Sequence, residues 1–161
     1  MAKILDNINN KLVNVGLKPI HPCTIMFYYI PLKGSISYTV LGTQMLTPEL
    51  YENVKLIIVP KYISLTNACL LNSFVGTSLY LFSRPHLLKT PPKERLAFCV
   101  FGSSMFNLGS MLLWALGRTV APDSTPLRFV IGLSGAAGLL WLATKYVSVI
   151  DSQISSKPHN K

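Results

Sequence analysis

Apolar residues gather into long uncharged runs in the second half of the chain. The run Leu96–Leu116 is 21 residues long and holds no charged side chain. A helix of that length, rising about 1.5 Å per residue, crosses a hydrocarbon core of about 30 Å. The run Phe129–Val149 is equally long, and its single charge, Lys145, lies one turn from its end, where a long side chain reaches the headgroups. This pattern predicts a transmembrane helix in each run.

A third uncharged run, Tyr62–Ser83, is more polar because it contains Asn67, Asn72 and Thr77. It is long enough for a third transmembrane helix, which we predict there. The expected fold is an all-α membrane protein with three transmembrane helices, preceded by an interfacial amino-terminal segment with short amphipathic helices. The expected organisation is a docking segment (residues 1–61), a three-span region (62–150) and a polar tail (151–161) that is a disordered end or a partner contact.

Threonine–proline pairs mark the predicted helix starts. A threonine hydroxyl caps helices, and proline is favoured at the first helical position. The pairs at positions 90–91 and 125–126 each precede an apolar run by a few residues. A third pair at positions 47–48 predicts a short helix that extends to about Lys55.

The first 46 residues contain no uninterrupted apolar run of membrane length. Residues 1–17 repeat apolar positions against a polar face, which predicts an amphipathic helix that ends near Gly16 and lies on a surface or packs on its own domain. As a mitochondrial presequence this stretch is poor, since it contains Asp6 and neither arginine nor serine, and it lacks a signal-peptide core. Residues 21–46 are aromatic and β-branched but interrupted by Pro31, so we expect an interfacial or partner-covered segment, with a short hairpin as one form.

Two asparagines lie at similar depths in the first two predicted spans. Asn72 is at the middle of the first span and Asn107 is near the middle of the second. A side-chain amide in hydrocarbon needs a bonding partner, and a pair across adjacent antiparallel helices is the simplest solution, worth about 0.6 to 2 kcal/mol. We therefore predict that this pair joins two helices; handling of a substrate is the alternative.

Small residues recur on one face of each later span, where another helix backbone can approach closely. The large residues Trp114 and Trp141 are expected to meet lipid, headgroups or a partner. The residues predicted to pack in this way are Gly102, Ser103, Gly109, Ser110, Gly132, Ser134, Ala136 and Gly138.

Composition agrees with a membrane location, because 50% of the residues are hydrophobic and only 13% are charged. Fifteen lysines and arginines against six acids give a formal charge of +9. The basic residues lie at the predicted span boundaries, so phospholipid headgroups explain the excess better than nucleic acid, which we do not expect as a partner. The predicted contacts with anionic headgroups are Arg84, Lys89, Lys93 and Arg95 in the loop between the first two spans.

Charge gives the orientation only weakly. Three spans put the amino-terminal segment and the carboxyl tail on opposite sides of the membrane. Counting cations near the spans gives four against seven, which favours the side of the 84–95 loop and the carboxyl tail as cytoplasm or matrix. Adding the four lysines of the amino-terminal segment makes the count eight against seven.

No pattern for catalysis, metal binding or a cofactor is present in the sequence. The six acids are scattered, and phosphate-binding, dinucleotide-binding and hydrolase motifs are missing. The three cysteines are widely spaced, and the three histidines are dispersed, with His86 expected to be a solvated loop residue. We therefore expect no enzyme activity and no cofactor.

These features favour a non-catalytic accessory subunit or assembly factor of a larger membrane complex, in the mitochondrial inner membrane. In size and layout the chain is similar to accessory subunits of respiratory complexes, a likeness of class that rests on no motif. The alternative is an oligomeric small-molecule transporter or channel component in which Asn72, Thr77 and Asn107 face a shared pore. A membrane enzyme of lipid metabolism ranks below both.

Overall fold

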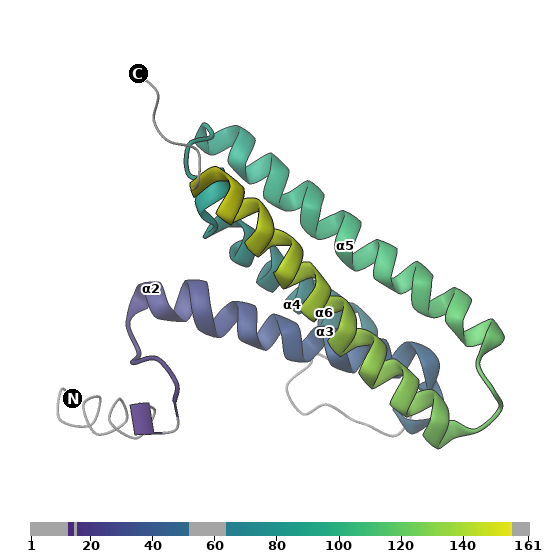
Figure 1. The fold of residues 1–161 in the computed structure, drawn as a ribbon. Helices are drawn as coiled ribbons and strands as arrows, with labels where there is room; N and C mark the ends of the chain where they lie inside the picture. Colours follow the sequence, from purple (N-terminus) through teal and green to yellow (C-terminus); the bar gives the residue numbers. More distant parts are fainter. Residues whose placement is uncertain (1–12, 15, 52–63, 156–161) are drawn as a thin grey trace.

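The computed structural model describes residues 13–14, 16–51 and 64–155, and the part of the chain that it describes consists of helices and turns without a strand (Figure 1). The all-helical expectation is confirmed for these residues. The elements in chain order are α2 (Pro22–Thr24), the π-helical turn η1 (Ile25–Tyr29), α3 (Ile30–Leu46), η2 (Pro48–Leu50), α4 (Leu65–Phe82), η3 (Pro85–Leu87), α5 (Pro92–Val120) and α6 (Thr125–Ser155).

Elements α2, η1 and α3 follow one another without a break and form one helix from Pro22 to Leu46. The expectation of an interrupted segment or a hairpin at residues 21–46 is therefore wrong. The π-helical turn explains how Pro31 is tolerated: the Ile30 N–H donates to the Ile25 carbonyl five residues earlier, and the proline, which has no N–H, follows directly. The proline thus comes directly after a turn in which the regular bonding pattern to the fourth preceding residue has already changed.

The four long helices alternate in direction. Helix α3 runs antiparallel to α4, because Gly34 meets Gly76 near one end of the pair and Gln44 Nε2 donates to Thr66 Oγ1 over 3.0 Å near the other. Helix α5 is antiparallel to α4, and α6 is antiparallel to α5 (Figure 1). Helix α3 is thus a fourth member of the bundle, and it contacts α4, α5 and α6.

The hydrophobic core lies where α3 meets the other helices. Tyr38 is 1% exposed and stacks on Phe106 of α5 with ring centroids 5.0 Å apart. The ring centroids of Trp114 and Tyr38 are 4.9 Å apart, and Trp114 is buried. The expectation that Trp114 faces lipid, headgroups or a partner is therefore wrong, whereas Trp141 is exposed. Leu41 of α3 is fully buried in the same cluster.

The helix starts lie within one or two residues of the predicted positions. Helix α5 begins at Pro92 and α6 at Thr125. No side chain caps α5, so the predicted cap at Thr90 is wrong, and the Thr47 hydroxyl makes no cap either but donates to the Thr43 carbonyl over 2.7 Å. Only the first part of the predicted helix after Thr47 is described, as the short η2. The cap observed for α4 is Ser64, which accepts from the Asn67 N–H.

Two of the helices are long and apolar enough to cross a membrane, namely Pro92–Val120 and Thr125–Ile154. They correspond to the second and third predicted spans. Only 22% and 11% of their most apolar windows are buried inside the molecule, unlike the core helices of a soluble protein. Helix α4 occupies the position of the first predicted span but is not one of the two, so three spans are not confirmed.

The two ends of the chain are described in part. Most of the predicted amphipathic helix at residues 1–17 lies outside the described residues, and Gly16 has a positive φ of 81°, typical of a residue that ends a helix. Helix α6 continues to Ser155. Residues 151–155 are therefore helical and not a disordered end, and the alternative that this tail contacts a partner stays a prediction.

Candidate functional site

A row of polar side chains runs through the interior of the bundle. The Tyr38 hydroxyl donates to Ser110 Oγ over 2.7 Å, and Ser110 Oγ donates to the Phe106 carbonyl. Ser103 Oγ donates to the Phe74 carbonyl over 2.8 Å, which ties α5 to α4. Each of these groups is satisfied within the protein, as burial requires.

Asn107 is 1% exposed and bonds α4, but not through Asn72. Its Oδ1 accepts from Ser73 Oγ over 2.5 Å, and its Nδ2 donates to the Ser103 carbonyl over 2.9 Å and lies 3.5 Å from Thr77 Oγ1. The predicted Asn72–Asn107 pair is therefore wrong by one position. Asn72 is half-buried, and its backbone carbonyl lies against Gly34.

Glycines of α3, which the sequence analysis did not single out, make the closest helix contacts. A Cβ added to Gly34 would lie 2.8 Å from the Gly76 Cα, and one added to Gly42 would lie 2.9 Å from the Trp114 ring. Gly34, Tyr38 and Gly42 recur every four residues, which is the spacing of a single helix face. That spacing was the available signal, and treating residues 21–46 as interrupted concealed it.

The predicted small-residue positions divide into inward and outward sets. Gly132 and Ala136 are buried against Gly42, and a Cβ added to Gly132 would lie 3.0 Å from the Gly42 carbonyl oxygen. Ser103 and Ser110 are buried as described above, and a Cβ added to Gly102 would lie 3.1 Å from Leu81 Cδ1. The outward set, which is exposed in this structure, consists of Gly109, Ser134 and Gly138.

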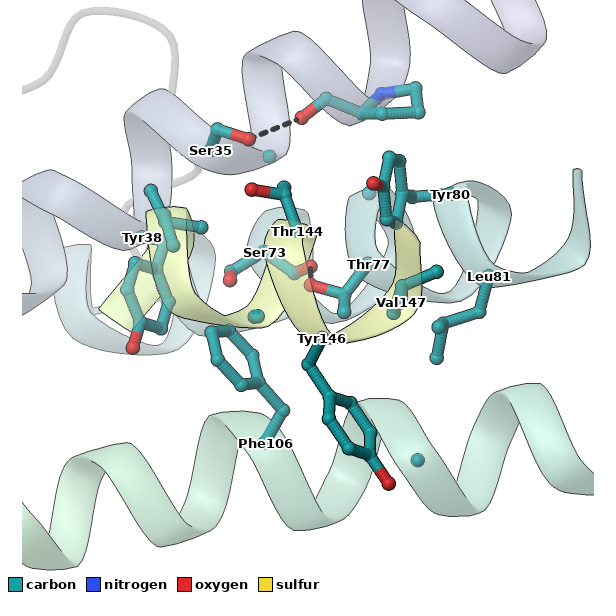
Figure 2. A pocket seen from close by; sticks show the side chains of 16 residues that line it. Ser35, Tyr38, Ser73, Thr77, Tyr80, Leu81, Phe106, Thr144, Tyr146 and Val147 are labelled. Atoms are coloured by element: carbon teal, nitrogen blue, oxygen red, sulfur yellow. Dashed lines mark hydrogen bonds between the residues drawn. The ribbon is translucent and has the colours of Figure 1, made fainter. Parts of the chain in front are cut away.

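A cavity of about 340 Å³ lies among α3, α4, α5 and α6 (Figure 2). Tyr38 of α3 and Ser73 and Thr77 of α4 form one side, and Phe106 of α5 and Val147 of α6 form the other. Its size is within the range of about 300–1,000 Å³ that is usual for small-molecule sites. The cavity is therefore a candidate binding site in the described part of the chain.

Charged residues gather near the η3 end of this cavity. The Arg84 guanidinium lies 4.0 Å from the centroid of the Tyr80 ring, and Arg84 Nη1 lies 3.7 Å from Asp151 Oδ2. His86 Nδ1 lies 2.7 Å from Asp151 Oδ1, and the His86 N–H donates to the same oxygen over 3.2 Å. The expectation that His86 is a solvated loop residue is wrong, because this clasp holds its side chain 14% exposed against α6.

The four predicted headgroup contacts differ in their surroundings. Arg84 is engaged with Asp151, and Arg95 Nη2 donates to the Phe82 carbonyl while its guanidinium stacks 3.9 Å from the Phe82 ring centroid. Lys89 and Lys93 are exposed. Arg84 thus connects the start of η3 to α6, and Arg95 connects α5 to the end of α4. The two lysines are on the surface of the protein.

The described residues include no cluster of three or more histidine, cysteine, aspartate or glutamate side chains that could hold a metal ion. The thiols of Cys23, Cys69 and Cys99 are free, and the first is exposed while the other two are buried. Comparison of the chain with protein-family models, curated proteins and solved structures found no match.

Proposed function

We propose that the chain is a non-catalytic multi-pass membrane protein that acts as an accessory subunit or assembly factor of a larger membrane complex. The supporting observation is the outward surface of α5 and α6. It carries large exposed apolar side chains such as Phe101, which is 63% exposed, and Leu112, also 63% exposed. Such a surface is unfavourable in water and suits lipid or a partner helix.

Small outward residues on the same helices favour a partner protein in addition to lipid. A Cβ added to Gly109 or Gly138 would have no atom of this chain within 4 Å. Each of these glycines therefore leaves a notch in the helix surface that no side chain of this protein fills. Small residues at helix interfaces let two backbones approach closely, which is how membrane helices associate. The mitochondrial inner membrane is the compartment we propose for this assembly, on the likeness of size and layout to respiratory accessory subunits.

The proposal is tested by native electrophoresis of membranes solubilised in mild detergent. We expect the chain to migrate with an assembly much larger than itself. The variant Gly109→Leu fills an outward notch and is expected to release the chain from the assembly, whereas Met105→Leu, one turn away and also exposed, leaves it bound. Migration of the unaltered chain only as a monomer would contradict the proposal, and recovery in another organelle would contradict the compartment alone.

The alternative, an oligomeric transporter or channel component, has less support. It requires Asn107 to face a pore shared between copies, but this side chain is buried and bonded within a single chain. Chemical cross-linking in the membrane separates the two functions. Unlike partners support an accessory subunit, and a closed set of identical copies supports the transporter.

A further inference from the structure

The cavity opens between the two helices that are long enough to cross a membrane. Tyr146 of α6 lines it and is 68% exposed, and Figure 2 shows this side chain extending from α6 toward α5. On the α5 side the lining residues are Gly102 and Phe106, and Gly102 has no side chain to close the gap beside Tyr146. With α5 and α6 across a bilayer, this opening lies on the side of the bundle and faces the acyl chains of the lipid.

Five of the polar side chains that line the cavity already have partners. Ser73 Oγ donates to Asn107, and Tyr38 donates to Ser110. Ser35, Thr77 and Thr144 each donate to a carbonyl of their own helix. A polar solute would find few free groups to replace its water, whereas an apolar chain costs no hydrogen bond on entry.

The cations lie where the headgroup of a lipid held in this cavity would be. Arg84 stacks on Tyr80, which lines the cavity. Lys145 is not a lining residue, and its ammonium lies 6.0 Å from the centroid of the exposed Trp141 ring. The exposed Lys89 and Lys93 add charge at the same end of the bundle. The described acids at this end are Asp151, held by His86 and Arg84, and the exposed Glu94.

We propose that the cavity holds one acyl chain of an anionic phospholipid, whose headgroup lies against the cations at the η3 end of the bundle. Tyr80 and Tyr146 line the cavity and are the residue type that prefers the boundary between the apolar and headgroup regions. The site requires residence in a membrane but does not require the partner complex, so it can be tested on the purified chain.

The occupant is tested with phosphatidylglycerol that carries a photoreactive diazirine at the end of one acyl chain, and with phosphatidylcholine of the same chain as reference. The full-length protein in mild detergent is irradiated with each probe, and labelled peptides are located by mass spectrometry. We expect labelling to concentrate on the lining residues of α5 and α6, with the anionic probe preferred. Labels spread evenly over the outer faces of both helices would overturn the proposal.

Filling the cavity provides the first matched comparison. Ala143→Phe places a ring in the cavity from α6, whereas Ala137→Phe places the same ring on the exposed face of the same helix. The first variant is expected to lose most of the labelling and the second to keep it, with helix content checked by circular dichroism. Equal labelling of both variants would show that the probe does not enter the cavity.

Charge provides the second comparison, on exposed residues whose replacement leaves the bundle intact. The double variant Lys89→Gln, Lys93→Gln is expected to reduce the preference for phosphatidylglycerol by roughly tenfold, because each cation near an anionic surface contributes to the attraction. Arg118→Gln, at the opposite end, leaves the preference unchanged. Equal labelling by the two probes in the unaltered protein would show an unselective cavity and overturn the anionic assignment. Weak labelling in native membranes that becomes strong after purification would identify a partner helix as the occupant instead.

Discussion

Glycine has two different roles in this bundle, and the surroundings of each glycine decide which. Gly34 and Gly76 bring the backbones of α3 and α4 into contact, so neither position has room for a Cβ. Gly109 lies on the exposed side of α5 with nothing of this chain within 4 Å of a Cβ. The same substitution should therefore have opposite effects at the two kinds of position.

We predict that Gly76→Ala lowers the free energy of unfolding by about 1–3 kcal/mol, because the new Cβ would lie 2.8 Å from the Gly34 Cα and 3.2 Å from the Ile30 carbonyl oxygen. Gly109→Ala should raise it by about 0.5–1 kcal/mol, since alanine is the better helix former. Denaturant or thermal unfolding in mild detergent measures both. A loss of stability of equal size in the two variants would contradict the close approach of α3 and α4.

The interior polar residues show what can and cannot be inferred about single residues. Asn107 was recognisable because an amide in an apolar run requires a partner. Its partner was not, because Asn72 and Ser73 are adjacent in α4 and the rotation of that helix selects between them. Helix rotation depends on contacts with α3, and no feature of the α4 run by itself specifies it.

At the scale of elements, α3 departs most from the sequence-based expectation. A proline normally ends a helix, and Pro31 was interpreted in that way. The π-helical turn η1 shifts the hydrogen-bond pattern one turn before the proline, so the helix continues through it. The positions of α5 and α6 were predictable because long uncharged runs have few other solutions, whereas α4 is more polar because α3 and α5 cover part of its surface.

One face of helix α3 is buried in the bundle, and this packing can be tested by substitutions within α3. Leu41 is fully buried, while Ile36 on the same helix is 61% exposed. We predict that Leu41→Ala lowers the free energy of unfolding by about 2–5 kcal/mol and that Ile36→Ala changes it by less than about 0.5 kcal/mol. Similar effects at the two positions, measured by unfolding in mild detergent, would instead favour an interfacial segment.

At the scale of the whole molecule, the fourth helix changes the side on which the amino-terminal end of α3 is expected. Because α3 runs antiparallel to α4, the amino-terminal end of α3 points toward η3. The carboxyl end of α6 also lies at η3, because Asp151 of α6 contacts His86 and Arg84. Lys18 and Lys33 are then on the same side as η3. The three-span arrangement instead places them on the side opposite η3. Among the described residues, the cations toward the η3 end are Lys18, Lys33, Arg84, Lys89, Lys93, Arg95 and Lys145, and those at the other end are Arg118 and Arg128.

For the proposed membrane protein, this distribution favours the η3 end as the cytoplasmic or matrix side, because cations accumulate on that side of membrane proteins. We predict that Cys23 and the thiol of Ser152→Cys react from the same side of sealed vesicles, and that the thiol of Asp123→Cys, in the loop between α5 and α6, reacts from the other. All three positions are exposed, and Cys69 and Cys99 are buried, which limits background labelling. A membrane-impermeant maleimide, applied before and after the vesicles are opened, measures the sidedness. If Cys23 and position 123 react from the same side, the start of α2 and the end of α6 are on opposite sides of the membrane. An odd number of helices then crosses the bilayer, as in the three-span arrangement.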